Sequence, residues 1–94
     1  MTIPEIERAY RERLPVKFLV LSVGMFVFDE IDALIYRRND AQLTTVSAEI
    51  KDRSGARCVY TINAEKIFFA NSADVKALEK NGGRFAIVTE GVKL

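Results

Sequence analysis

The side chains able to carry out chemistry are few, and their types exclude most catalytic machinery. The 94 residues contain no histidine and a single cysteine, Cys58. Histidine is the usual general base and a common metal ligand, so its absence removes the Ser–His triads and most zinc sites. One cysteine cannot build a cysteine-rich zinc or iron–sulfur site. We therefore predict a non-enzymatic protein without a metal or cofactor, since catalysis would have to rely on carboxylates, lysines or Tyr60.

Cys58 is the only thiol, and a cysteine nucleophile needs a helix N-terminus or a nearby cation to stabilise its thiolate. Arg57 is its neighbour, but consecutive side chains of a strand point to opposite faces. Alternation puts Cys58 on one face with Tyr60 and Ile62, which predicts a small core residue. A single cysteine also forms no internal disulfide, which fits a reducing compartment and favours a cytoplasmic location.

Three carboxylates, Asp29, Glu30 and Asp32, form the one acidic cluster. Calcium loops need regularly spaced oxygen ligands around a central glycine, and that spacing is absent. Paired carboxylates perform acid–base catalysis only when they are held together in a site. The cluster separates two apolar stretches, so we interpret it as a solvated bend.

The basic residues suggest an alternative function in nucleic-acid binding. Arginines and lysines that flank two neighbouring strands could contact phosphates across one surface. The candidate contacts are Arg37, Arg38, Lys51, Arg53 and Arg57. However, Lys and Arg total 14 and Asp and Glu total 13, and this balance lacks the basic excess of a strong nucleic-acid binder.

Exposed apolar side chains indicate protein contacts instead. Phe26 and Phe28 are typical core residues of a small domain, although phenylalanines can also stack on bases. Phe68 and Phe69 are adjacent, so within a strand one of them must face outward. The segment 84–89, RFAIVT, offers a further apolar strand. The predicted protein contacts are Phe68, Phe69, Phe85 and Ile87.

The stretch 16–28, VKFLVLSVGMFVF, is apolar at both alternating sets of positions. It is shorter than the about 20 residues that a membrane-spanning helix needs, so we predict no membrane contact. Three glutamates precede it and no small-residue cleavage site follows, which argues against a secretion signal. The pattern favours strand structure that is buried on both faces.

The remaining patterns predict a single domain over 1–94, built from short strands between helices. Thr2 and Glu5 have capping-box spacing, and Ile3, Ile6, Tyr10 and Leu14 line one helical face. Asn71 or Ser72 caps a second helix, with Val75 and Leu78 inward and Gly82 after its end. The expected elements are a helix over 2–14, strands over 16–23 and 25–37 with a bend near Asp29, strands over 43–51 and 57–62, a helical turn over 63–66 with a strand over 67–70 (alternatively one helix over 63–70), a helix over 72–81, a strand over 84–89 and a frayed end.

This element order is typical of a small SH3-like or Sm-like barrel with an N-terminal helix and an added C-terminal helix and strand. The alternative is an open antiparallel α+β sheet with both helices on one face. We expect the chain to be a protein-interaction module that self-associates through apolar strand surfaces, because a small barrel does not hide both faces of 16–28. The alternative is a nucleic-acid-binding SH3-like domain, and a small-ligand binder or enzyme is a third hypothesis.

Overall fold

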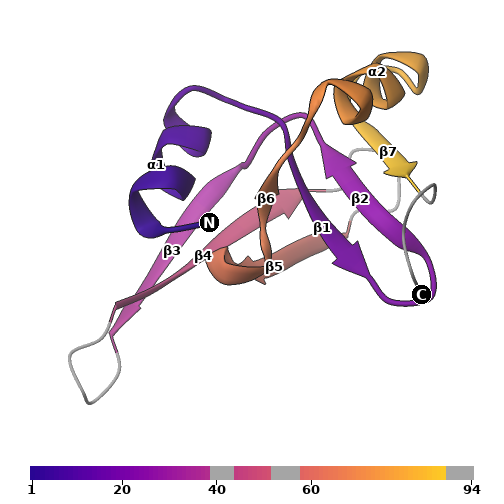
Figure 1. Ribbon diagram of the computed structural model, residues 1–94. Helices are drawn as coiled ribbons and strands as arrows, with labels where there is room; N and C mark the ends of the chain where they lie inside the picture. The colour runs from indigo at the N-terminus through magenta and orange to yellow at the C-terminus, as the bar shows by residue number, and fades with distance from the viewer. Residues whose placement is uncertain (39–43, 52–57, 89–94) are drawn as a thin grey trace.

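The computed structural model describes residues 1–38, 44–51 and 58–88, and it is mainly β with two helices (Figure 1). The predicted basic residues Arg53 and Arg57, and the predicted frayed end, lie outside the described residues. The elements are α1 (Ile3–Arg11), β1 (Val16–Val20), β2 (Gly24–Phe28), β3 (Ala33–Arg38), β4 (Thr44–Lys51), β5 (Val59–Asn63), the 3-10 turn η1 (Ala64–Lys66), β6 (Phe68–Phe69), α2 (Ser72–Lys80) and β7 (Phe85–Val88).

The strands form two antiparallel sheets. Sheet A has the order β6-β1-β2-β7, and sheet B has the order β3-β4-β5. Among the described strands none belongs to both sheets, so the described part of the chain shows no closed barrel. The SH3-like barrel therefore remains a prediction, whereas the coarser α+β class of the alternative fits the structure.

The predicted bent strand over 25–37 is wrong, because this stretch contributes one strand to each sheet. The chain changes sheets at 29–32, and two backbone hydrogen bonds define the change. The N–H of Asp29 donates to the carbonyl of Arg84 beside sheet A, at 3.1 Å. The N–H of Asp32 donates to the carbonyl of Glu49 in sheet B, at 2.9 Å. The acidic bend is thus the crossover between the two layers.

The main core lies between the sheets and is rich in aromatic rings. Phe18 stacks on Phe28 with ring centroids 5.7 Å apart, and Phe26 meets Phe85 edge-on at 5.3 Å. Tyr60 of sheet B contacts the same rings. Such rings supply a large apolar area in a short chain. The prediction that 16–28 forms buried strands is confirmed for its inward-facing residues.

Helix α1 begins as predicted but ends early. The capping box is present, with the N–H of Glu5 donating to the Thr2 hydroxyl and the N–H of Thr2 donating to the Glu5 carboxylate. The helix stops at Arg11 rather than Leu14, because Arg13 adopts a positive φ of 53°. Its buried residues are Ile6 and Ala9, whereas Ile3 and Tyr10, which the spacing places on one helical face with Ile6, are exposed.

The C-terminal elements follow their sequence signals. Residues 63–70 form η1 and β6 rather than one helix, and Asn71 caps α2. Gly82 takes a φ of +95°, and the N–H of Gly83 closes the helix on the Leu78 carbonyl at 2.7 Å, as in a Schellman motif. None of the described helices is long and apolar enough to cross a membrane.

The two helices cover different parts of the molecule, at separate places in Figure 1. Helix α1 contributes to the core between the sheets, whereas α2 packs on the opposite face of sheet A. The second cluster is small and consists of Val27, Leu78 and Ala86. The alternative fold was therefore wrong in placing both helices on one face.

Candidate functional site

Sheet A has an inner face toward the main core and an outer face that carries α2. Strand alternation and the pairing register decide which residues lie outside. Phe68 pairs with Lys17, Leu19 with Met25, and Val27 with Ala86. These six residues, together with Val88, form the outer face.

Helix α2 is joined to this face by an ion pair. The Lys17 ammonium lies 2.7 Å from a carboxylate oxygen of Asp74, and the same oxygen accepts the N–H of Asn71 at 2.9 Å. Asp74 is only 4% exposed. Lys17 is the one ionisable side chain in the four strands of sheet A. Its charge is therefore neutralised within the molecule.

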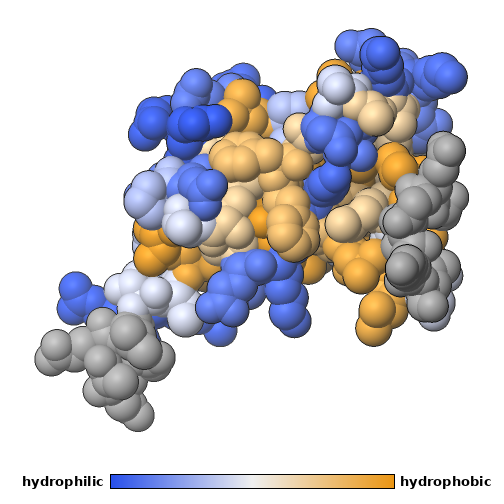
Figure 2. Space-filling model, viewed as in Figure 1, coloured by the Kyte–Doolittle hydropathy of each residue, from blue (hydrophilic) through white to orange (hydrophobic). Residues whose placement is uncertain are grey.

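The half of the outer face beyond α2 is open. Leu19 is 41% exposed, and the tip of the β1–β2 hairpin adds Leu21 at 78% and Val23 at 39%. Phe68 is 49% exposed on the edge strand β6. Figure 2 shows apolar surface over this side of sheet A and at the hairpin tip. We call Leu19, Leu21, Val23 and Phe68 the outer patch.

The four predicted protein contacts are not brought together. Phe68 and Phe69 form β6 at one edge of sheet A, and Phe85 and Ile87 belong to β7 at the other edge. Phe69 packs against the core with the Arg8 guanidinium 5.1 Å from its ring centre, so Phe68 is the outward ring of that pair. Phe85 also packs against the core, whereas Ile87 is exposed. Phe68 and Ile87 remain accessible to a partner.

The described basic candidates lie apart on sheet B. Arg37 and Arg38 are exposed at the end of β3, where they pair with the first residues of β4. Lys51 is exposed at the other end of β4. At about 3.3 Å per residue, this separation amounts to roughly 20 Å. No compact basic patch therefore forms from these three residues.

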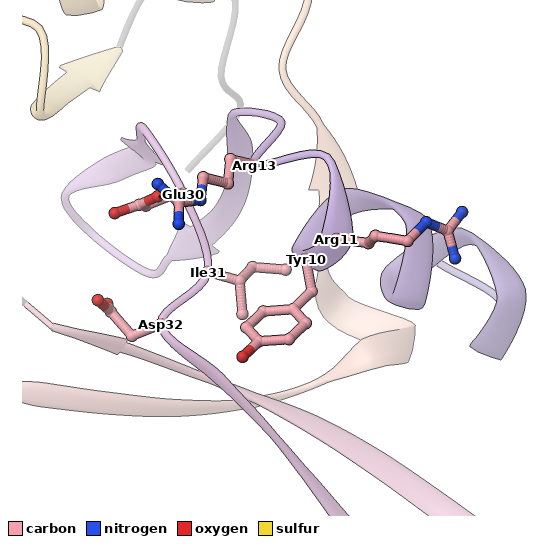
Figure 3. Close-up of a pocket in the computed structure, with 6 residues that line it drawn as sticks. All are labelled: Tyr10, Arg11, Arg13, Glu30, Ile31 and Asp32. Atoms are coloured by element: carbon pink, nitrogen blue, oxygen red, sulfur yellow. Dashed lines mark ion pairs between the residues drawn. The ribbon is translucent and has the colours of Figure 1, made fainter.

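A polar pocket of about 320 Å³ lies between the end of α1 and the β2–β3 crossover (Figure 3). Its acidic residues already have structural partners. Arg13 is 3.9 Å from Glu30, and Asp32 accepts the N–H of Lys51 at 2.6 Å. In Figure 3 the side chains of Arg11 and Asp32 point in different directions. The pocket is lined by Tyr10, Arg11, Arg13, Glu30, Ile31 and Asp32.

Two further residues have surroundings that the sequence does not predict. Cys58 lies just before β5 and is exposed, so the prediction of a small core residue is wrong. Tyr36 donates to the Glu7 carboxylate at 2.7 Å, and this hydrogen bond raises the pKa of Tyr36 above its usual 10.0. Among the described residues, no group of three or more His, Cys, Asp or Glu side chains is placed to hold a metal ion.

The outer patch was only partly visible in the sequence. The adjacency of Phe68 and Phe69 predicts one outward ring without deciding which, and Leu19, Leu21 and Val23 belong to the stretch that is predicted to be buried. The sequence predicts a break at Gly24, but the turn occupies 21–23, with a φ of 68° at Ser22 and of 136° at Gly24. No protein-family model, curated protein or solved structure matches this chain.

Proposed function

We propose that this chain is a non-enzymatic interaction domain that self-associates through the outer patch of sheet A. The observation that carries the proposal is the uncovered half of the outer face, which ends in Leu21 at 78% exposure. A sheet face normally packs on another layer, and here α2 covers only one half. A second copy supplies the missing layer.

Charge favours a copy of the same chain as the partner. Lys17 is the sole charge within the strands of sheet A, and Asp74 neutralises it at 2.7 Å. Because this face carries no net charge, it does not select a partner with a charged surface. Two identical faces therefore stack about a two-fold axis without repulsion, as an isologous interface requires.

The hairpin tip gives the interface a protruding anchor. Val20 and Gly24 close the β1–β2 hairpin, so Leu21 and Val23 project beyond the end of the sheet. The N–H of Val23 donates to the Val20 carbonyl at 3.1 Å, which closes the turn at the tip. Large apolar side chains on a fixed turn lose little freedom when a partner covers them.

The test is the oligomeric state over a concentration series, measured by sedimentation velocity. We expect a monomer–dimer equilibrium in the wild type. Leu21→Asp places a charge in the interface, and we expect it to weaken association at least tenfold, which is about 1.4 kcal/mol. The substituted side chain is mostly exposed, so the fold should be retained.

Val59→Asp is the matched control, because Val59 is also an exposed apolar residue but lies on sheet B. It should associate like the wild type. A wild type that stays monomeric up to about millimolar concentration would overturn the proposal, since that limit corresponds to a negligible interface. Equal weakening by both substitutions would also count against it.

Nucleic-acid binding by an SH3-like surface is the second candidate, and the adjacent exposed arginines Arg37 and Arg38 are what supports it. It receives less support, because Lys51 lies at the far end of β4. This function requires affinity for RNA or DNA that falls steeply as salt increases. We further propose a cytoplasmic location, on the basis of the single thiol.

A further inference from the structure

A groove runs between the last turn of α2 and the edge strand β7, away from the outer patch. Its volume is about 410 Å³. The helix contributes Ala77, Lys80 and Asn81, and the strand contributes Phe85, Ala86 and Ile87. The groove thus has an apolar floor, a lysine at its rim and the edge of a sheet as one wall.

The backbone of β7 determines what the groove can bind. Hydrogen-bonded and non-hydrogen-bonded pairs alternate along an antiparallel ladder. Asp29 donates to the Arg84 carbonyl, so the 29–84 pair is hydrogen-bonded. With the observed register, Ala86 then faces β2 with its N–H and C=O, whereas the backbone groups of Phe85 and Ile87 point to the open edge.

Within the described chain, only some of the backbone groups at this open edge have a hydrogen-bond partner. The side-chain amide of Asn81 donates to the Phe85 carbonyl at 2.7 Å. The N–H and C=O of Ile87 have no such contact among the described residues. Strand β7 contains no charged residue, proline or bulge that would block the pairing of another strand.

We propose that this groove binds an extended segment of a partner protein, which adds to sheet A as a strand beside β7 and carries an acidic residue for Lys80. Strand addition draws its affinity from main-chain hydrogen bonds and its specificity from pockets for alternate side chains. From the register, we infer that the N–H and C=O of Ile87 form the main-chain hydrogen bonds to the added strand. The small side chains of Ala77 and Ala86 leave room for an apolar side chain of the partner.

Charge selects the acidic class of partner. Lys80 lines the groove, Lys76 lies one helical turn away on the same side of α2, and Arg84 precedes β7. In the part of the chain that the structure describes, these three cations make no ion pair. A carboxylate beside the bound strand would therefore lie near the Lys80 ammonium at the rim of the groove.

The probe is a library of random nine-residue peptides displayed on phage and selected on the immobilised full chain. We expect the enriched peptides to combine alternating apolar, β-branched residues with at least one Asp or Glu and to lack central proline. Failure to enrich any sequence over the bare support would overturn the proposal. Enrichment of basic or helix-forming peptides would overturn it equally.

The sharpest variant is Ile87→Pro, tested by fluorescence anisotropy with the most enriched peptide. It removes an outward N–H and leaves the hydrogen bonds between β2 and β7 intact, so we expect at least tenfold weaker binding. Ile87→Thr keeps the N–H and the branched side chain, and its binding should change less than threefold. Equal affinities of these two variants would contradict strand addition.

Lys80→Glu keeps the proposal testable if Ile87→Pro fails to fold, as judged by circular dichroism. We expect it to weaken the acidic peptide at least threefold and to favour basic peptides in a repeated selection. Lys66→Glu makes the same charge change on η1, outside the groove, and should leave binding unchanged. If Lys80→Glu bound the peptide with unchanged affinity, the proposal of an acidic partner would be wrong. Leu21→Asp should bind the peptide normally, which separates this site from self-association.

Discussion

The two helices start with the same capping motif but use it for different purposes. In α1 the box joins Thr2 and Glu5, and in α2 it joins Asn71 and Asp74. In each box the acidic side chain accepts the N–H of the capping residue, at 2.8 Å and 2.9 Å respectively. Glu5 is exposed, whereas Asp74 is buried and also bonds the Lys17 ammonium.

This difference shows that a local motif can become a tertiary anchor when it is buried. The Glu5 box orders only the first turn of α1, because its groups remain in contact with water. The Asp74 box fixes the start of α2 and at the same time holds that helix on sheet A. A buried carboxylate of this kind has to keep every partner, since each lost bond leaves an unsatisfied charge.

The largest expected effect comes from Asp74→Ala. Removal of the carboxylate leaves the Lys17 ammonium largely buried without its counter-ion, so we expect a loss of about 3–5 kcal/mol in the free energy of unfolding. The free energy of unfolding is measured by urea denaturation. Glu79→Ala, an exposed position on the same helix, is the control and should change stability by less than about 0.5 kcal/mol. A loss below about 1 kcal/mol at position 74 would mean that the ion pair is no anchor.

An intermediate effect is expected at the two capping residues themselves. Thr2→Ala and Asn71→Ala each remove one side-chain acceptor for a backbone N–H, which costs about 1 kcal/mol. Both variants should therefore lose similar stability in urea denaturation, and both should lose less than Asp74→Ala. If Asn71→Ala lost as much stability as Asp74→Ala, the helix cap rather than the ion pair would be the main contribution to the stability of this region.

The smallest effect is a pH dependence confined to α1. The N–H of Thr2, assisted by its hydroxyl, lowers the pKa of Glu5 below the ordinary 4.5. A lowered folded-state pKa gives stability that is present above about pH 4.5 and is lost as the pH falls through the folded value. We expect the protection of the first-turn amides of α1, measured against their intrinsic exchange rates, to decrease over that acidic range. Glu5→Gln should abolish this pH-dependent loss of protection, and persistence of the loss in that variant would assign the effect to another group.

Sequence patterns located the elements well, because their signals are local. Capping boxes, the Gly82 helix stop and the alternation in β4 depend on neighbouring residues. The prediction of a helical turn and a strand over 63–70 is also confirmed. These features require no knowledge of what packs against them.

Assignments that depend on distant partners were less successful. The stretch 25–37 reads as one strand, since nothing local shows that 29–32 exchanges one sheet for another. Nothing local indicates that Asp74, an acidic residue in the first turn of a helix, is bonded to Lys17, because the two residues are remote in the chain. For the candidate site, alternation predicted one outward phenylalanine at 68–69 but not the uncovered half of sheet A, which depends on where α2 lies.

The strand order of sheet A has a consequence for synthesis of the chain. The central hairpin β1–β2 forms from neighbouring residues, but its flanking strands arrive late: Val16 pairs with Phe69, and Met25 pairs with Val88. On the ribosome, sheet B can therefore assemble while both sides of that hairpin still await their neighbours. During that interval both edges of the hairpin are unpaired and the Lys17 ammonium lacks its Asp74 counter-ion, so the incomplete chain exposes apolar strand edges to other chains.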